Sequence, residues 1–297
     1  MKKIKSLFCI GLLLTVATTV NAQSVTWISS TEGNVWQKSK VKLQSKSEQN
    51  PVLQVDGTEN GVVFKNWGTT FNELCWDALG VLTRTEQDEI LYNIFSPQGD
   101  LRITRGRISM GANDYARSWY SCDEVEGDFE LRYFNINRDK QTIIPFIRAA
   151  QKYNPNLTFW ISPWCPPSWM KINGDYPVLS SPFNSLSEKQ NYLLYGATGG
   201  QVDENEMKLT DARDGVFPRQ LATTDFMIQD PRYLQTYADY FCRFIDAYKE
   251  QGIPIDMVMY QNEAYSYTPY PGCAWTAAGT IRFNKEYLAP TLKQMHP

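Results

Sequence analysis

The stretch that decides the fold is Ile255–Tyr265, which reads IDMVMYQNEAY. A short apolar run ends abruptly in the polar residues Gln261–Glu263. Its length and polar boundaries predict a buried strand of a parallel sheet. Parallel α/β folds place their chemistry at the carboxyl ends of the strands, so an amide beside a carboxylate here suggests a catalytic site. We interpret Glu263 as a general acid/base, and the plain alternative is a solvated glutamate at a strand end.

Upstream of this stretch, β-prone runs alternate with helical patterns. The predicted strands are Val62–Trp67, Leu101–Met110 and Leu157–Ile161. The order β-α-β-α-β, a long polar insertion at 173–230 and then α-β-α predicts a parallel sheet covered by helices. A closed (β/α)8 barrel and a doubly wound sheet both fit, and the polar strand ends with long following loops favour the barrel. Only four β/α units are present, so we expect the N-terminal part of a longer barrel protein or some other fold.

Capping residues and apolar periodicity predict the helices. Thr85, with Asp88 as its reciprocal partner, marks the start of one helix, and Asp139 that of a second. Leu234–Tyr248 carries apolar side chains at helical spacing, and a last helical stretch runs from about Thr276 to Met295. The apolar face of the second helix comprises Ile143, Ile144, Ile147 and Ala150.

The N-terminus has the pattern of a secretory signal peptide over residues 1–22. Three lysines precede Leu7–Val20, an apolar run too short to span a bilayer, and Ala22 ends a small-residue cleavage site. We therefore expect export to the periplasm, the cell surface or the medium. Residues 23–63 contain short β-prone runs such as Val25–Ile28 and Val52–Val55, separated by turn residues, and form a predicted N-terminal β segment.

Composition excludes several classes of function. The net charge of −3 leaves no basic footprint for nucleic acid, and no segment after the leader is apolar enough to span a membrane. The single histidine, His296, excludes a histidine-based nucleophile triad and a multi-histidine metal site. No CxxC pair, P-loop or dinucleotide fingerprint occurs, so we expect neither metal nor cofactor. Carboxylate, amide, arginine and aromatic chemistry remains.

The predicted strand ends supply those groups. They are Trp67 at the first strand, Arg107 and Asp114 at the second, Trp164 at the third, and Asn262 with Glu263 at the fourth. A sugar site needs polar groups for hydroxyls, an aromatic wall and a carboxyl at the scissile oxygen, and a barrel would bring these together. The alternatives are that the tryptophans cap the core, that Arg107 and Asp114 pair with each other, and that Asn262 satisfies a backbone group.

Three motifs, in this order, resemble those of glycoside hydrolase family 30, in particular its glucosylceramidase branch. They are Arg107–Tyr115 (RISMGANDY), Ser162–Gly174 (SPWCPPSWMKING) and Gln261–Glu263 (QNE). The resemblance implies a (β/α)8 barrel, of which residues 64–297 would form the first half, and a side β-sandwich that would include residues 23–63. It also implies retaining hydrolysis of a β-glycoside carbohydrate substrate.

The resemblance assigns roles by position. Glu263 is expected to be the acid/base, and Asn262 to contact the sugar 2-hydroxyl. Asp114 and Trp164 are expected to hold the glycone, with Arg107 beside them in the substrate site. The aromatic residues that follow Glu263 could form aglycone subsites or merely pack the loop; they are Tyr265, Tyr267, Tyr270 and Trp275.

Retaining hydrolysis requires a second carboxylate as nucleophile. In the family it comes from a later strand, so we expect it beyond the end of this chain. Glu73, Asp77 and Asp123 are possible in principle, without support from their sequence context. The expected activity is that of a β-glucosidase of glucosylceramidase type. The alternatives are an endo-β-1,6-glucanase or β-xylanase of the same family, or a truncated, inactive half-barrel that only binds sugar.

Overall fold

The computed structural model describes residues 24–42, 61, 63, 65–186, 225–264 and 266–296. The chain divides into two compact units, residues 1–63 and 64–297. The leader at 1–22, the run Val52–Val55, Tyr265 and much of the insertion lie outside the described residues.

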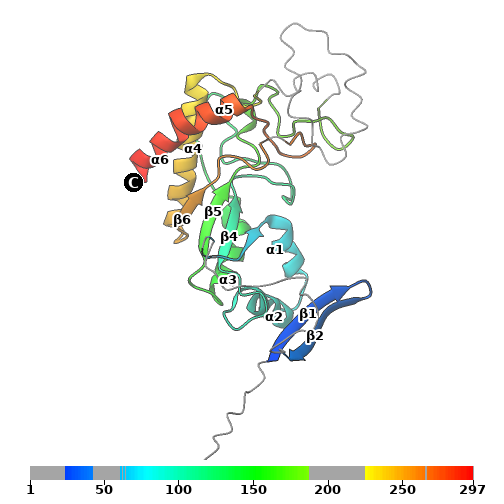
Figure 1. The fold of residues 1–297 in the computed structure, drawn as a ribbon. Helices are drawn as coiled ribbons and strands as arrows, with labels where there is room; N and C mark the ends of the chain where they lie inside the picture. Colours follow the sequence, from blue (N-terminus) through cyan, green and yellow to red (C-terminus); the bar gives the residue numbers. More distant parts are fainter. Residues whose placement is uncertain are drawn as a thin grey trace, which may run out of the picture. The chain divides into compact units, whose positions relative to one another are not determined.

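The first unit contains an antiparallel hairpin of β1 (Ser24–Thr31) and β2 (Asn34–Lys42), shown in blue in Figure 1. Gly33, at a φ of +75°, occupies the turn, a conformation that glycine adopts without a steric penalty. The strand expected around Val25–Ile28 is therefore present and longer than predicted.

The second unit is built on a parallel sheet with the strand order β3-β4-β5-β6. The strands are β3 (Gly68–Phe71), β4 (Arg105–Ser109), β5 (Thr158–Ser162) and β6 (Ile255–Val258). Thr70 lies opposite Arg107, and Ser109 lies opposite Ser162. Because the strands are parallel and in sequence order, their carboxyl ends meet at one edge of the sheet, as the barrel prediction requires.

The two faces of this sheet differ in chemistry. On one face, Ile108, Phe159 and Ile161 are completely buried. The other face carries Arg107 and Trp160, which are half-buried. This alternation follows from the period of two along a strand, and it presents arginine and indole groups on the face away from the apolar core.

Helices lie in the connections between the strands and after β6 (Figure 1). They are α1 (Glu73–Gly80), α2 (Arg84–Phe95), α3 (Ile143–Gln151), α4 (Pro231–Glu250), α5 (Ala277–Arg282), a π-helical segment (Phe283–Leu288) and α6 (Ala289–Met295). The predicted apolar faces are confirmed. Ile143, Ile144, Ile147 and Ala150 of α3 are buried. So are the residues that give Leu234–Tyr248 on α4 its helical spacing, which are Leu234, Tyr237, Ala238, Phe241, Ile245 and Tyr248. Helix α1 was not predicted.

Both predicted caps were wrong. Thr83, rather than Thr85, caps α2 through a capping box with Glu86. Thr83 and Thr85 each have an acid three residues later, so the local pattern alone does not choose between them. Asp139 does not cap α3, because its buried carboxylate accepts hydrogen bonds from the hydroxyls of Tyr120 (2.7 Å) and Tyr248 (2.6 Å).

Two strand predictions also need correction. The first barrel strand is Gly68–Phe71 and does not lie within Val62–Trp67, since pairing with β4 begins at Gly68. Trp67 therefore precedes the strand at the end opposite to the site. The strand β6 is parallel as predicted, but it is not fully buried, because it is the edge strand of the described sheet and Met257 is 40% exposed.

Candidate active site

Arg107 lies at the centre of the polar edge of the sheet. Its Nη2 donates to Asn262 Oδ1 at 2.6 Å, and Nε and Nη2 donate to Ser162 Oγ at 2.9 and 2.7 Å. The guanidinium lies over the Trp164 ring at 4.1 Å and over the Trp160 ring at 4.9 Å. One cation thus joins the carboxyl ends of β4, β5 and β6. A guanidinium suits this role because it is planar and carries five N–H donors.

Two carboxylates face this cation without a direct ion pair. Burial lowers the pKa of Arg107, and the charges of Asp114 and Glu263 act in the opposite direction. Within the described residues Arg107 forms no salt bridge, so the alternative of a simple Arg107–Asp114 pair is not what the structure shows. Asp114 is exposed on the loop after β4, where a ligand can reach its carboxylate.

Asn262 is held in one orientation. Its backbone N–H donates to Pro163 O at 2.7 Å, and its side-chain oxygen accepts from Arg107. Arginine has only donors, so the oxygen of the amide must face Arg107 and the NH2 group faces away. Asn262 therefore offers hydrogen-bond donors rather than acceptors to the site.

Glu263 occupies a left-handed backbone conformation, with a φ of +47°. This conformation costs a residue with a side chain about 1–2 kcal/mol, and such positions are found at functional sites more often than elsewhere. The Glu263 carbonyl accepts a hydrogen bond from Ser266 N at 2.9 Å, which closes a tight turn. The Glu263 side chain is exposed.

Trp164 is the aromatic residue that follows β5 at this edge. It is buried, its ring packs against Arg107, and its carbonyl accepts from Gln261 Nε2 at 2.6 Å. The structure thus joins three of the five residues predicted from sequence by direct contacts, Arg107, Trp164 and Asn262. The other two, Asp114 and Glu263, both act electrostatically on the Arg107 cation.

Tyr270 joins this group, and sequence reasoning left its role open. Burial raises the pKa of the Tyr270 phenol, and the charges of Glu263 and Asp114 raise it further. Tyr270 also lines a small hollow with Asn262 and Glu263. Tyr267 and Trp275 are buried and pack the loop, so only Tyr270 among the described aromatic residues after Glu263 faces the carboxylates. In the sequence, the position of Tyr270 shortly after Glu263 was the only sign of a role in the site.

The other carboxylates considered as nucleophiles are occupied elsewhere. Glu73 is buried and accepts from Arg138 Nε and Nη2 at 2.9 and 2.7 Å. Asp77 binds the Arg117 guanidinium through both oxygens. Asp123 is buried, and burial, with Asp128 and Glu124 nearby, raises its pKa to about 6. None of the three has a described contact with Glu263.

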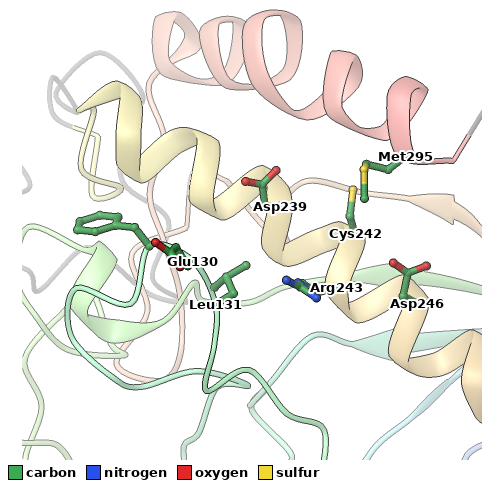
Figure 2. Close-up of a pocket in the computed structure, with 8 residues that line it drawn as sticks. Glu130, Leu131, Asp239, Cys242, Arg243, Asp246 and Met295 are labelled. Atoms are coloured by element: carbon green, nitrogen blue, oxygen red, sulfur yellow. The ribbon is translucent and has the colours of Figure 1, made fainter.

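A hollow of about 540 Å³ lies elsewhere, against α4 (Figure 2). Asp239, Arg243 and Asp246 of α4 line it, with Glu130 and Leu131 across from them. It contains none of the strand-end residues, so its position does not support a role in the candidate site.

Among the described ranges, no three acidic, histidine or cysteine side chains gather in a way that could hold a metal ion. In the same part of the chain, no helix has both the length and the apolar character to cross a bilayer.

The expected family is matched by sequence. The family model described as the glycosyl hydrolase family 30 TIM-barrel domain matches residues 64–181. A Caenorhabditis elegans protein named "Putative glucosylceramidase 3" is 29% identical over 268 residues, which cover 86% of this chain and 42% of that protein. An endo-1,6-β-D-glucanase of Aspergillus fumigatus is 25% identical over 252 residues, 83% of this chain and 45% of that protein.

Solved structures support the same fold. SrfJ from Salmonella typhimurium aligns with a TM-score of 0.61 and 18% identity, covering 90% of this chain and 50% of that one. The endo-β1,6-glucanase BT3312 aligns with a TM-score of 0.54 and 23% identity, covering 77% of this chain and 41% of that one. The four parallel strands and their helices are thus consistent with part of an α/β barrel, and the chain spans about half the length, or less, of the proteins that it matches.

Proposed function

Since this chain belongs to glycoside hydrolase family 30, we propose that it forms part of a retaining β-glycoside hydrolase in which Glu263 is the general acid/base. The observation that carries this proposal is the Arg107–Asn262 hydrogen bond beside the strained turn at Glu263. This bond brings an amide donor, a carboxyl group and the Trp164 ring to one edge of the sheet, which is where barrel enzymes place their catalytic groups.

The proposed roles follow from the chemistry of each group. In the first step Glu263, as a carboxylic acid, gives its proton to the glycosidic oxygen as the aglycone leaves. In the second step the resulting carboxylate removes a proton from water. Asn262 donates from its outward NH2 group to the sugar 2-hydroxyl, and Asp114 accepts from glycone hydroxyls. Arg107 orients Asn262 and supports the Trp164 ring against the sugar.

The retaining mechanism also needs a nucleophilic carboxylate about 5–5.5 Å from the acid/base. Glu73, Asp77 and Asp123 are unsuited to that role because of the contacts described above. The matched relatives are about twice as long as this chain, and we place the nucleophile in the region that they have in addition.

Localisation and domain roles are part of the proposal. The lysine-rich, apolar leader over residues 1–22 supports export, and the hairpin of β1 and β2 supports a contribution to a side β-sandwich. Mass spectrometry of the exported protein tests the first point, with a new N-terminus at Gln23 expected.

For the substrate we place β-glucosides first, because the relative named after glucosylceramidase is the more similar of the two compared proteins. An endo-β-1,6-glucanase is the second candidate, supported by the similarity to a protein of that name in Aspergillus fumigatus. A β-xylanase and a half-barrel that only binds sugar are the remaining alternatives.

A panel of substrates separates these candidates. The full-length protein is incubated with aryl β-glucosides, β-1,6-glucan and β-1,4-xylan, and released sugars are measured. Faster hydrolysis of the aryl β-glucosides supports the first candidate, and oligosaccharides released from β-1,6-glucan support the second. Binding of a glucan without hydrolysis of any substrate, by protein confirmed to be folded, would contradict an enzymatic role.

A further inference from the structure

The side chain of Gln261 precedes the proposed acid/base by two residues and is 6% exposed. Its Nε2 donates to Trp164 O at 2.6 Å and to Asn262 O at 2.9 Å. Its Oε1 accepts from the indole Nε1 of Trp275 at 3.2 Å. The orientation of this amide is unambiguous, because the nitrogen faces two carbonyl acceptors and the oxygen faces a donor that cannot accept.

One of these bonds acts on the peptide plane that enters Glu263, and the other two hold the Gln261 amide in place. Asn262 O belongs to the peptide that joins Asn262 to Glu263, so holding this oxygen sets the φ of Glu263, which is +47°. The φ angle in turn sets the direction in which the Glu263 side chain leaves the backbone. From this geometry we infer that Gln261 is a positioning residue that aims the carboxyl group of Glu263, an inference that rests on the proposed function.

The other contacts of the turn do not replace this one. Asn262 is fixed separately, by Pro163 O at its backbone N–H and by Arg107 at its side chain. On the far side of Glu263, Trp275 N donates to Ala264 O at 2.8 Å. Loss of the Gln261 amide therefore leaves Asn262 in place and frees the peptide that enters Glu263.

We call Gln261 and its three hydrogen bonds the Gln261 clamp, and Trp275 anchors this clamp in the core. Trp275 is 2% exposed, and its ring stacks on Phe283 and meets Tyr260 edge-on, with ring centroids 5.2 and 5.7 Å apart. The bond from its indole to Gln261 Oε1 therefore ties the acid/base turn to the packed start of the C-terminal helices. A strained φ persists only where the surroundings over-determine it, and Gln261 supplies that determination here.

The test is the isosteric variant Gln261→Glu in the full-length protein. A carboxylate has no donor for Trp164 O or Asn262 O, while it keeps an acceptor for Trp275. We measure kcat/KM for two β-glycosides that share a glycone, one with a poor alkyl leaving group and one with a dinitrophenyl leaving group. Only the first needs a proton from Glu263.

We expect kcat/KM for the alkyl glycoside to fall about 100-fold, since misplacing a reacting group by an ångström costs about that much. For the dinitrophenyl glycoside we expect a change of less than about threefold. The matched control is Gln87→Glu on α2, which also removes an amide bond to a carbonyl, Leu82 O at 2.9 Å, away from the site. It should leave both substrates unchanged.

Equal losses with the two leaving groups, or none, would overturn the inference. The variant Glu263→Gln in the same assay tests the proposed function independently. If Glu263→Gln hydrolyses the alkyl glycoside like the wild type, the proposed function fails. If Glu263→Gln loses activity on the alkyl glycoside but Gln261→Glu shows no greater loss on it than on the dinitrophenyl glycoside, only the inference about Gln261 fails. The NMR signal of the Trp275 indole N–H provides a readout without activity. It should shift in Gln261→Leu, and an unchanged signal would contradict the hydrogen bond.

Discussion

The Arg107 guanidinium donates to Asn262 Oδ1 at 2.6 Å, which joins β4 to the end of β6 across the intervening β5. The same guanidinium binds Ser162 and stacks on Trp164. A hydrogen bond between strands that are not neighbours makes the orientation of Asn262 depend on the register of the whole sheet. The candidate site is therefore a property of the fold and not of one loop.

Replacing Arg107 by lysine should lower kcat/KM of the full-length enzyme by about 10- to 100-fold. A lysine ammonium cannot bind Ser162 and Asn262 and also stack flat on Trp164, as the guanidinium does. The control is Arg105→Lys on the same strand, where lysine can still pair with Asp256. Steady-state kinetics on an aryl β-glucoside checks this, and equal activity of both variants would show that Arg107 does not orient the site.

Gly106 lies between these two arginines and is required by packing. A Cβ at this position would lie 2.5 Å from Phe71 Cε2 and 2.9 Å from Phe159 Cδ1. Gly106→Ala should lower the free energy of unfolding by about 1–3 kcal/mol through overpacking. Gly80→Ala, at the end of α1 where a Cβ would meet no atom within 4 Å, should leave the stability unchanged or raise it by up to about 1 kcal/mol. Urea unfolding of the two variants measures the difference, and similar values would contradict the packing explanation.

Glu73→Gln should destabilise the protein by about 3 kcal/mol at pH 7, because it leaves the Arg138 guanidinium without its buried partner. The control Glu130→Gln breaks an exposed pair with Arg132 and should change stability by less than about 0.5 kcal/mol. Urea unfolding gives both values. Comparable losses in the two variants would contradict the importance of burial.

The Glu73 carboxyl also predicts a pH dependence. Burial raises its pKa, but hydrogen bonds from Arg138 and the Arg117 amide outweigh burial, and the pKa lies below its ordinary value of 4.5. A group with a lowered pKa in the folded state stabilises the protein above pH 4.5, and this stabilisation is lost as the pH falls through the lowered value. The wild type should therefore lose more stability between pH 5 and pH 3 than Glu73→Gln does.

Asp123→Asn should have the opposite effect. Burial, aided by Asp128 and Glu124 and opposed by the Val125 amide, raises the pKa of Asp123 to about 6. The stability linked to a raised carboxyl pKa is present below the ordinary value of 3.8 and is lost as the pH rises through about 6. The asparagine variant should thus be more stable by about 1 kcal/mol at pH 7 and should match the wild type near pH 4. A stability difference that does not change with pH would contradict this.

Much of the fold followed from patterns that are local in sequence. The apolar periodicity of Leu234–Tyr248 predicted the buried face of α4, because helical spacing and burial are directly linked. The first strand was predicted at Val62–Trp67, whereas it begins at Gly68. β-prone residues continue across this boundary, and only pairing with β4 decides where the strand starts. Thr83 replaced Thr85 as the cap for a similar reason.

The site was predictable in its members but not in its contacts. Their position at strand ends predicted Arg107, Asn262 and Glu263 as members of the site, since the carboxyl ends of parallel strands meet at one edge of the sheet. The partners of Arg107, Ser162 and Asn262, lie more than 50 positions away from it in sequence. The turn at the left-handed Glu263 is tied to Trp164 through Gln261, across 97 positions. No local pattern encodes such contacts, and the role of Gln261 emerges only once Trp164 and Trp275 are placed around it.

The most direct test of the account is the activity of Glu263→Gln in the full-length protein, with alkyl and dinitrophenyl β-glycosides and added azide. An amide at this position cannot give a proton to the leaving group. We predict that hydrolysis of the alkyl glycoside falls by at least about 1,000-fold, and that azide restores turnover of the dinitrophenyl glycoside by forming a glycosyl azide of retained configuration. Wild-type turnover of the alkyl glycoside by Glu263→Gln would contradict the assignment of Glu263 as the acid/base.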